Sequence, residues 1–75
     1  MRRRRARLPM LESLERYKQV TVGIGRETRR LAHDFTRDED YEAGAAAVVA
    51  SDAAAALSRG VDNLIRHIYR INSQP

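Results

Sequence analysis

The glycine pair in Gly23-Ile24-Gly25 is the first spacing in this sequence that could carry chemistry. In dinucleotide-binding loops such glycines let the backbone approach a phosphate, and the start of the following helix attracts the phosphate charge. The third glycine of that pattern is replaced here by Thr28, and so short a chain has no room for a strand-helix-strand unit. We therefore interpret the two glycines as a weak point in a helix. The weaker alternative is a small oligomeric enzyme in which Gly23, Gly25 and Arg26 lie near an anionic ligand.

Metal binding is the second chemistry that the residue types allow, because imidazole and carboxylate groups are common metal ligands. The chain has two histidines, His33 and His67, and a cluster of acids in Asp38, Glu39, Asp40 and Glu42. No Glu-x-x-His or His-x-x-x-His pair occurs, and we expect the acids to act as helix-capping charges. No serine, threonine or lysine is combined with a histidine and an acid in a recognisable catalytic order. We therefore predict no metal, no cofactor, no catalytic residue and no enzymatic activity.

Phosphate binding is the chemistry best represented, because five arginines fall within residues 2–7. Each arginine can neutralise a phosphate and release condensed counterions, which gives salt-dependent binding without sequence readout. Further arginines continue a basic stripe, so the candidate residues for a phosphate or an acidic partner are Arg2, Arg3, Arg4, Arg5, Arg7, Arg26, Arg29 and Arg30. A charged stripe is equally what any soluble helix shows, and no aromatic residues are interleaved as stacking platforms. Nucleic-acid binding is therefore the alternative prediction, not the leading one.

These side chains must be positioned by a chain of only 75 residues, which has no cysteine and a net charge of +4. Such a chain forms one domain at most and buries too little surface to be more than marginally stable alone. Disulfides are excluded and a structural metal is not expected, so we expect association with a partner to contribute. The apolar residues are mainly alanine, without the alternating β-branched runs of a sheet protein. The composition therefore predicts an all-α protein.

The charge is divided unevenly along the chain. Residues 1–37 carry eleven Lys/Arg and four Asp/Glu, whereas residues 38–75 carry three and six. The two halves attract each other, which would steady an antiparallel hairpin or steer the basic end toward an acidic partner. We predict a disordered basic arm over residues 1–8 and a helical hairpin domain over residues 9–75. No apolar run is long enough to cross a bilayer. We expect a cytoplasmic protein, or an organelle-targeted one if the Arg-rich start is a transit segment, although this start lacks the serines that are typical of one.

Two helices are predicted from apolar residues spaced by three and four. The first starts at Pro9, and its apolar face is Leu11, Leu14, Tyr17, Thr21, Ile24, Thr28, Leu31 and Phe35. Glycines and β-branched residues over residues 20–25 favour a kink or break there, and a strand in this segment would have no second strand to pair with. A capping-box pattern from Thr36 to Glu39 predicts a second helix that ends near Asn72. Its inner face is predicted to be Ala43, Ala46, Ala50, Ala53, Leu57, Val61, Leu64, Ile68 and Ile71.

A turn near Thr36 and Arg37 would fold these helices into an antiparallel hairpin in which the numbers of facing residues sum to about 74. That register leaves the last apolar residues opposite the basic arm, which cannot cover them. The predicted partner-binding residues are therefore Leu64, Ile68, Tyr69 and Ile71. We predict that a homodimer or another protein completes the hairpin. The leading hypothesis is a small non-enzymatic interaction protein, an adaptor or a subunit of a larger assembly, and the alternative is a nucleic-acid-binding regulator or packaging accessory.

Overall fold

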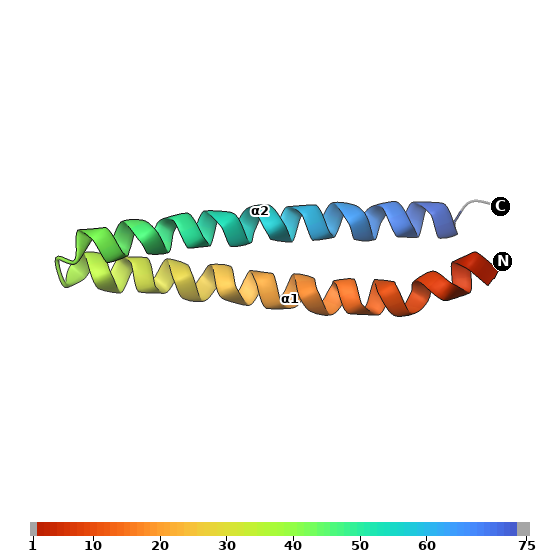
Figure 1. Cartoon of the computed structure of the whole chain (residues 1–75), viewed down its shortest axis with the longest axis horizontal. Coiled ribbons are helices and arrows are strands. Elements are labelled where there is room, and N and C mark those ends of the chain that lie inside the picture. Colours follow the sequence, from red (N-terminus) through yellow and green to blue (C-terminus); the bar gives the residue numbers. More distant parts are fainter. Residues whose placement is uncertain (1, 74–75) are drawn as a thin grey trace.

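Two long helices make up the structure, which is a computed structural model. They are α1 (Arg2–Arg37) and α2 (Tyr41–Asn72), and they run antiparallel (Figure 1). The structure describes residues 2–73, and the side chains of residues 9–71 and 73. The hairpin measures 57 × 15 × 12 Å, and its radius of gyration is 17.0 Å. A compact chain of this length would have a radius of gyration of about 11 Å. The predicted all-α hairpin is confirmed, and it is a rod.

The first helix is continuous through the segment where a kink or break was predicted. Residues 20–25 are α-helical, and Gly25 packs against α2. A Cβ atom built on Gly25 would lie 3.7 Å from the Cβ of Ala54, which is an ordinary van der Waals contact, so the two helices lie close together at this level. The helix runs past Pro9, which lies inside α1 and not in its first turn. The division into a basic arm over residues 1–8 and a hairpin domain over residues 9–75 is not tested by the structure and stays a prediction.

The turn lies at residues 38–40, later than the sequence predicted. At the end of α1 the N–H of Asp40 donates to the carbonyl of Phe35 at 2.8 Å, and the N–H of Glu39 donates to Thr36 at 3.1 Å. Glu39 has a φ of 64°, so this is a Schellman ending with a left-handed residue. The predicted capping box at Thr36 is wrong, because the Thr36 hydroxyl donates to the carbonyl of Ala32 inside α1. Asp40 caps α2 instead and accepts from the N–H of Ala43 at 3.1 Å.

The later turn also corrects the predicted register. Lys18 pairs with Asp62, and Gly25 lies against Ala54. The numbers in these pairs sum to about 80, not 74, because the centre of the turn has moved from residue 37 to residue 39. This shift brings Ile68 against Leu11, and both are buried together with Ile65. The apolar core therefore lies at the open end of the hairpin, where the sequence predicted uncovered residues.

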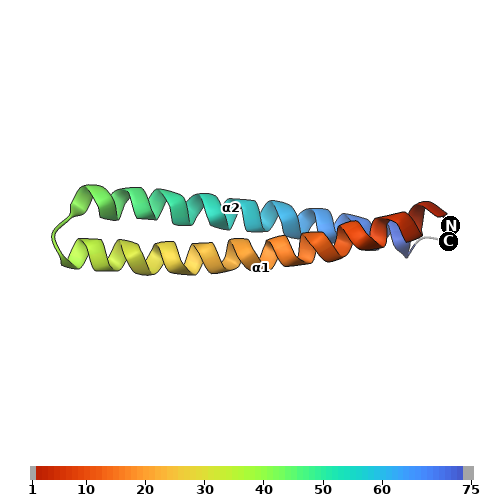
Figure 2. The same cartoon turned by 60° about the horizontal axis from the view of Figure 1, so that its bottom comes forward.

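The helices pack as an antiparallel coiled coil. In Figure 1 they lie beside each other along their whole length, and in Figure 2 they cross in projection near the open end. The inner positions follow a seven-residue repeat with alternating steps of three and four, and each is buried or half-buried. In α1 these positions are Leu11, Leu14, Lys18, Thr21, Gly25, Thr28, Ala32 and Phe35. In α2 they are Gly44, Ala47, Ser51, Ala54, Ser58, Val61, Ile65 and Ile68.

The inner face of α2 therefore differs from the predicted one over most of its length. Five of the predicted inner residues are exposed, namely Ala46, Ala50, Ala53, Leu57 and Leu64. In each case the next residue along the chain is buried or half-buried instead. In α1 the large residues Tyr17, Ile24 and Leu31 are likewise exposed. The physical reason is that the apolar face of each helix is broader than the seam that one neighbouring helix can cover. Part of each apolar face therefore stays outside the hairpin.

Candidate functional site

One side of the hairpin carries a row of apolar side chains from both helices, most of them large. The residues lie seven apart, at the g position of the repeat, next to the inner positions. We call them the apolar stripe; its members are Met10, Tyr17, Ile24, Leu31, Ala43, Ala50, Leu57, Leu64 and Ile71. In an antiparallel pair the two g rows share one side. At the open end, for example, Met10 and Tyr17 of α1 and Leu64 of α2 line the same hollow of about 520 Å³.

The exposure of this stripe is high for residues of its type. Its six large members other than Ile71 have exposed fractions of 43–57%. The accessible surface of the chain is 6094 Å². A folded protein of 8.5 kDa has about 4,650 Å² on average. Extended apolar patches of this kind mark interaction sites on soluble proteins.

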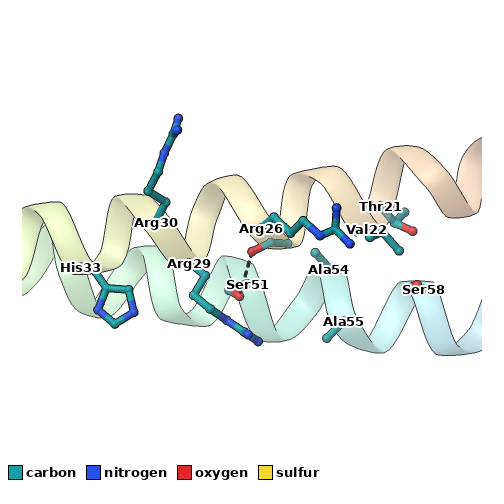
Figure 3. Close-up of a pocket in the computed structure, with 11 residues that line it drawn as sticks. Thr21, Val22, Arg26, Arg29, Arg30, His33, Ser51, Ala54, Ala55 and Ser58 are labelled. Carbon is teal, nitrogen blue, oxygen red and sulfur yellow. Dashed lines mark hydrogen bonds between the residues drawn. The ribbon is translucent and has the colours of Figure 1, made fainter.

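The opposite side of the hairpin holds a shallow basic groove of about 510 Å³. Small residues form its floor, because the two helices meet there through Gly25, Ser51 and Ala54, and the Ser51 hydroxyl donates to the carbonyl of Gly25 at 3.3 Å (Figure 3). Basic residues of α1 line its rim, namely Arg26, Arg29, Arg30 and His33. The side chain of Arg30 points away from α2 and pairs with Glu27. Arg26 and Arg29 are in no ion pair with the side chains that the structure describes, and they remain available to an anion.

Two polar contacts join the helices near the open end. Asp62 accepts from the Lys18 ammonium group at 2.6 Å and lies 3.0 Å from the Arg66 guanidinium group. The hydrogen bond from Lys18 is the main reason why the pKa of Asp62 is lowered. The Tyr69 hydroxyl donates to the Glu15 carboxylate at 2.9 Å. That bond and the nearby negative charge raise the pKa of Tyr69. These contacts fix the register at the end where the apolar core lies.

The partner-binding residues predicted from the sequence lie in different environments. Leu64 is exposed on the apolar stripe, whereas Ile68 is buried in the core. Tyr69 is exposed on the opposite side with its hydroxyl on Glu15, and Ile71 is half-buried. The prediction of an uncovered end is therefore wrong for Ile68, because the register that exposed it is wrong. The partner-binding role of the others stays a prediction.

The predicted phosphate-binding arginines are placed only in part. Arg26, Arg29, Arg30 and His33 all line the rim of the basic groove, but the side chain of Arg30 points away from α2. The side chains of Arg2, Arg3, Arg4, Arg5 and Arg7 lie outside the part of the chain whose side chains are described. Sequence reasoning missed Tyr17, Ile24, Leu31 and Leu57 as surface residues, since it assigned them to the core. The sequence carries no signal that could have found them, because the seven-residue spacing of large apolar residues from Met10 to Leu31 is equally typical of an inner position.

The described residues contain neither a metal-binding cluster nor a membrane-spanning helix. No group of three or more histidine, cysteine or acidic side chains is placed to hold a metal ion in that part of the chain. Neither helix, over its described length, has a stretch apolar and long enough to pass through a lipid bilayer. Comparisons with protein-family models, with curated proteins and with solved structures give no match.

Proposed function

We propose that this chain is a non-enzymatic helical interaction protein, an adaptor or a subunit of an assembly, that docks through its apolar stripe. The observation that carries the proposal is the placement of Tyr17, Ile24, Leu57 and Leu64 on one outer side while the inner seam contains serine, threonine and glycine. A hairpin that had to be stable alone would gain more by turning these large residues inward. Their outward placement suits a surface that a further helix or helix pair covers.

The basic groove supports a second candidate function, which is contact with nucleic-acid phosphates. It rests on Arg26 and Arg29, which lie one helical turn apart on the rim of the groove. Guanidinium groups bind phosphate oxygens in two-pronged geometry. The groove and the stripe lie on opposite sides of the rod, so the two functions are compatible. We rank this one second, because the arginines at the rim are also ordinary for an exposed helix face.

Site-specific photo-cross-linking in the expressing cell tests the leading proposal. A photoreactive phenylalanine analogue replaces Leu57 on the stripe or, as the control, Val48 on the opposite side. Both positions are on α2, and their exposed fractions are 57% and 49%. We expect a discrete protein adduct from the Leu57 position, either with another copy or with a different protein, and none from the Val48 position. Equal or absent adducts at both positions would overturn the proposal.

Fluorescence anisotropy with a short DNA duplex at several salt concentrations tests the second candidate. Replacing Arg26 and Arg29 with alanine should weaken binding and reduce the slope of log K against log salt by about 2, since each phosphate contact contributes roughly 0.9. The control replaces Arg16 and Arg70, two exposed arginines near the open end, and carries the same change in charge. An equal loss in both variants would mean that net charge alone attracts the duplex.

A further inference from the structure

We propose that the partner covering the apolar stripe is a second copy of this chain, stacked stripe to stripe with its turn beside the open end of the first. This inference rests on the proposed function and names the occupant of the same surface. The product is a four-helix bundle with a two-fold axis across the middle of the rod. Three observations favour this occupant and this orientation: the surface area, the sizes of the side chains along the stripe, and the charges at the two ends.

The surface area of one chain exceeds that of an average folded protein of its mass, and an extensive interface would remove the excess. Two separate chains expose twice 6094 Å², whereas an average folded protein of twice 8.5 kDa exposes about 7,700 Å². Pairing two hairpins to that value would bury about 4,500 Å² in total, which falls within the roughly 2,000–5,000 Å² of obligate homodimers. A second copy offers a matching rod of the same 57 Å length. A short peptide would leave much of the stripe uncovered.

The sizes of the side chains change along the stripe in a way that favours the antiparallel orientation. The open end carries the large Met10, Tyr17 and Leu64, and the turn end carries the small Ala43 and Ala50. A two-fold axis level with Ile24 and Leu57 overlaps the two rods over about 45 Å of their 57 Å length. Counting 1.5 Å per residue from there places Met10 at the level of the second copy's Ala43, and Tyr17 at the level of its Ala50. At each of these two levels a large residue of one copy lies beside an alanine of the other, and Leu31 of the second copy shares the level of Tyr17.

The charges at the two ends of the rod favour the same orientation. Around the turn, residues 34–42 contain five acidic residues and one arginine. At the open end, residues 2–18 contain seven basic and two acidic residues, and residues 62–73 contain two arginines and one aspartate. Stacking two turns together would place acids against acids and arginines against arginines. The antiparallel orientation brings the basic end of each copy to the acidic turn of the other, and such complementarity selects orientation in protein association.

Pulsed electron paramagnetic resonance can read this orientation directly. The chain has no cysteine, so Glu42→Cys introduces a single labelling site near the turn on the exposed surface of α2. In the antiparallel dimer the two labels lie about 15 residues from Leu57 at the axis, on opposite sides, which predicts a separation of about 45 Å along the rod. Stacking turn on turn would bring them within roughly 20 Å, because packed helices are 8–10 Å apart. That short distance would overturn the proposed orientation.

Light scattering on the pure chain tests the existence of the dimer. We expect twice the chain mass of 8.5 kDa, and Ile24→Glu should weaken the dimer by at least 100-fold because it places one carboxylate from each copy near the axis. The matched control is Val48→Glu on the opposite side, since Val48 and Ile24 have exposed fractions of 49% and 48%. Equal weakening by both variants would overturn the stripe as the dimer interface. The distance measurement keeps the native stripe, so it decides the question even if Ile24→Glu unfolds the chain.

A pure chain of single mass that shows helical circular dichroism and gives no distance between labels would refute the second copy as the occupant. That result would not by itself refute the proposed function. A cross-link from the Leu57 position to a different protein would still support docking through the stripe, whereas a single mass without any cross-link would overturn both.

Discussion

Gly44 allows the two helices to approach closely beside the turn, and its replacement by alanine should destabilise the protein. A Cβ atom at this position would lie 2.7 Å from the Thr36 hydroxyl oxygen and 3.5 Å from the carbonyl oxygen of Ala32. The first separation is too short for a contact between a Cβ atom and a non-bonded oxygen. Either Thr36 leaves its hydrogen bond to Ala32, or the helices separate locally. The neighbouring helix therefore restricts this glycine, in addition to its own backbone preference.

The magnitude follows from two opposing effects. Alanine is favoured over glycine inside a helix by about 1 kcal/mol. Against that, loss of the Thr36 hydrogen bond costs about 1 kcal/mol, and overpacking costs roughly 1–3 kcal/mol. We expect Gly44→Ala to lower the free energy of unfolding by about 1 kcal/mol. Gly60→Ala is the matched control, because a Cβ atom at Gly60 meets nothing within 4 Å. That variant should gain about 1 kcal/mol.

Thermal unfolding followed by circular dichroism at 222 nm measures both changes at one fixed protein concentration, since association would make the midpoint depend on concentration. The two variants should differ by about 2 kcal/mol, or roughly 8–16 °C in the midpoint for a chain of this size. Thr36→Ala removes the obstructing hydroxyl, so Gly44→Ala should cost less in that background than in the native one. The steric argument would be refuted if Gly44→Ala and Gly60→Ala stabilised the native chain equally.

Three further predictions concern the turn and the two polar contacts. Glu39→Gly should stabilise the hairpin by about 1 kcal/mol in the same melting assay, because glycine adopts the φ of 64° at no steric cost, and Glu39→Gln should have little effect. Because the pKa of Asp62 is lowered in the folded protein, its contribution to stability is present above the ordinary aspartate pKa and is lost as the pH falls through the lowered value. Urea unfolding between pH 7 and pH 2 should show less acid destabilisation for Asp62→Asn than for the native chain, and an unchanged difference would contradict the contact with Lys18. In an ultraviolet titration of the tyrosines, Glu15→Gln should return the raised pKa of Tyr69 toward its ordinary value, while a titration identical to the native one would argue against their hydrogen bond.

The sequence was sufficient to predict two antiparallel helices, but not how they face each other. The register depends on one turn, and both Thr36 and Asp40 are good capping residues, so composition cannot choose between them. The face of α2 depends on a segment in which nearly every residue from Ala43 to Ala56 is small. Such a segment gives no periodic signal, because each of its faces buries a similar area. The error of one residue on most of this face follows from that uniformity.

The candidate sites were predictable to different degrees for the same reason. Arg26, Arg29 and Arg30 are close in sequence, so their common location follows from helical spacing alone. The groove beneath them depends on Ser51 and Ala54 of the other helix, and therefore on the register. The apolar stripe was hidden because a residue such as Ile24 fits the pattern of an inner position and of a flanking one equally well. The register of the hairpin decides which of the two positions it takes.

The apolar core at the open end has a consequence for how the chain folds. Leu11 and Ile68 meet there although 56 residues separate them along the chain, and the inner positions from Lys18 to Ala32 that lead toward the turn are small or polar. Closing so long a loop costs conformational entropy before its strongest contacts are made. The turn can form early but gains little stability until the far ends meet. The core therefore holds the two ends of the chain together. Leu11→Ala weakens this core and should lower the protection of backbone amides from hydrogen exchange, from the open end toward the middle of both helices.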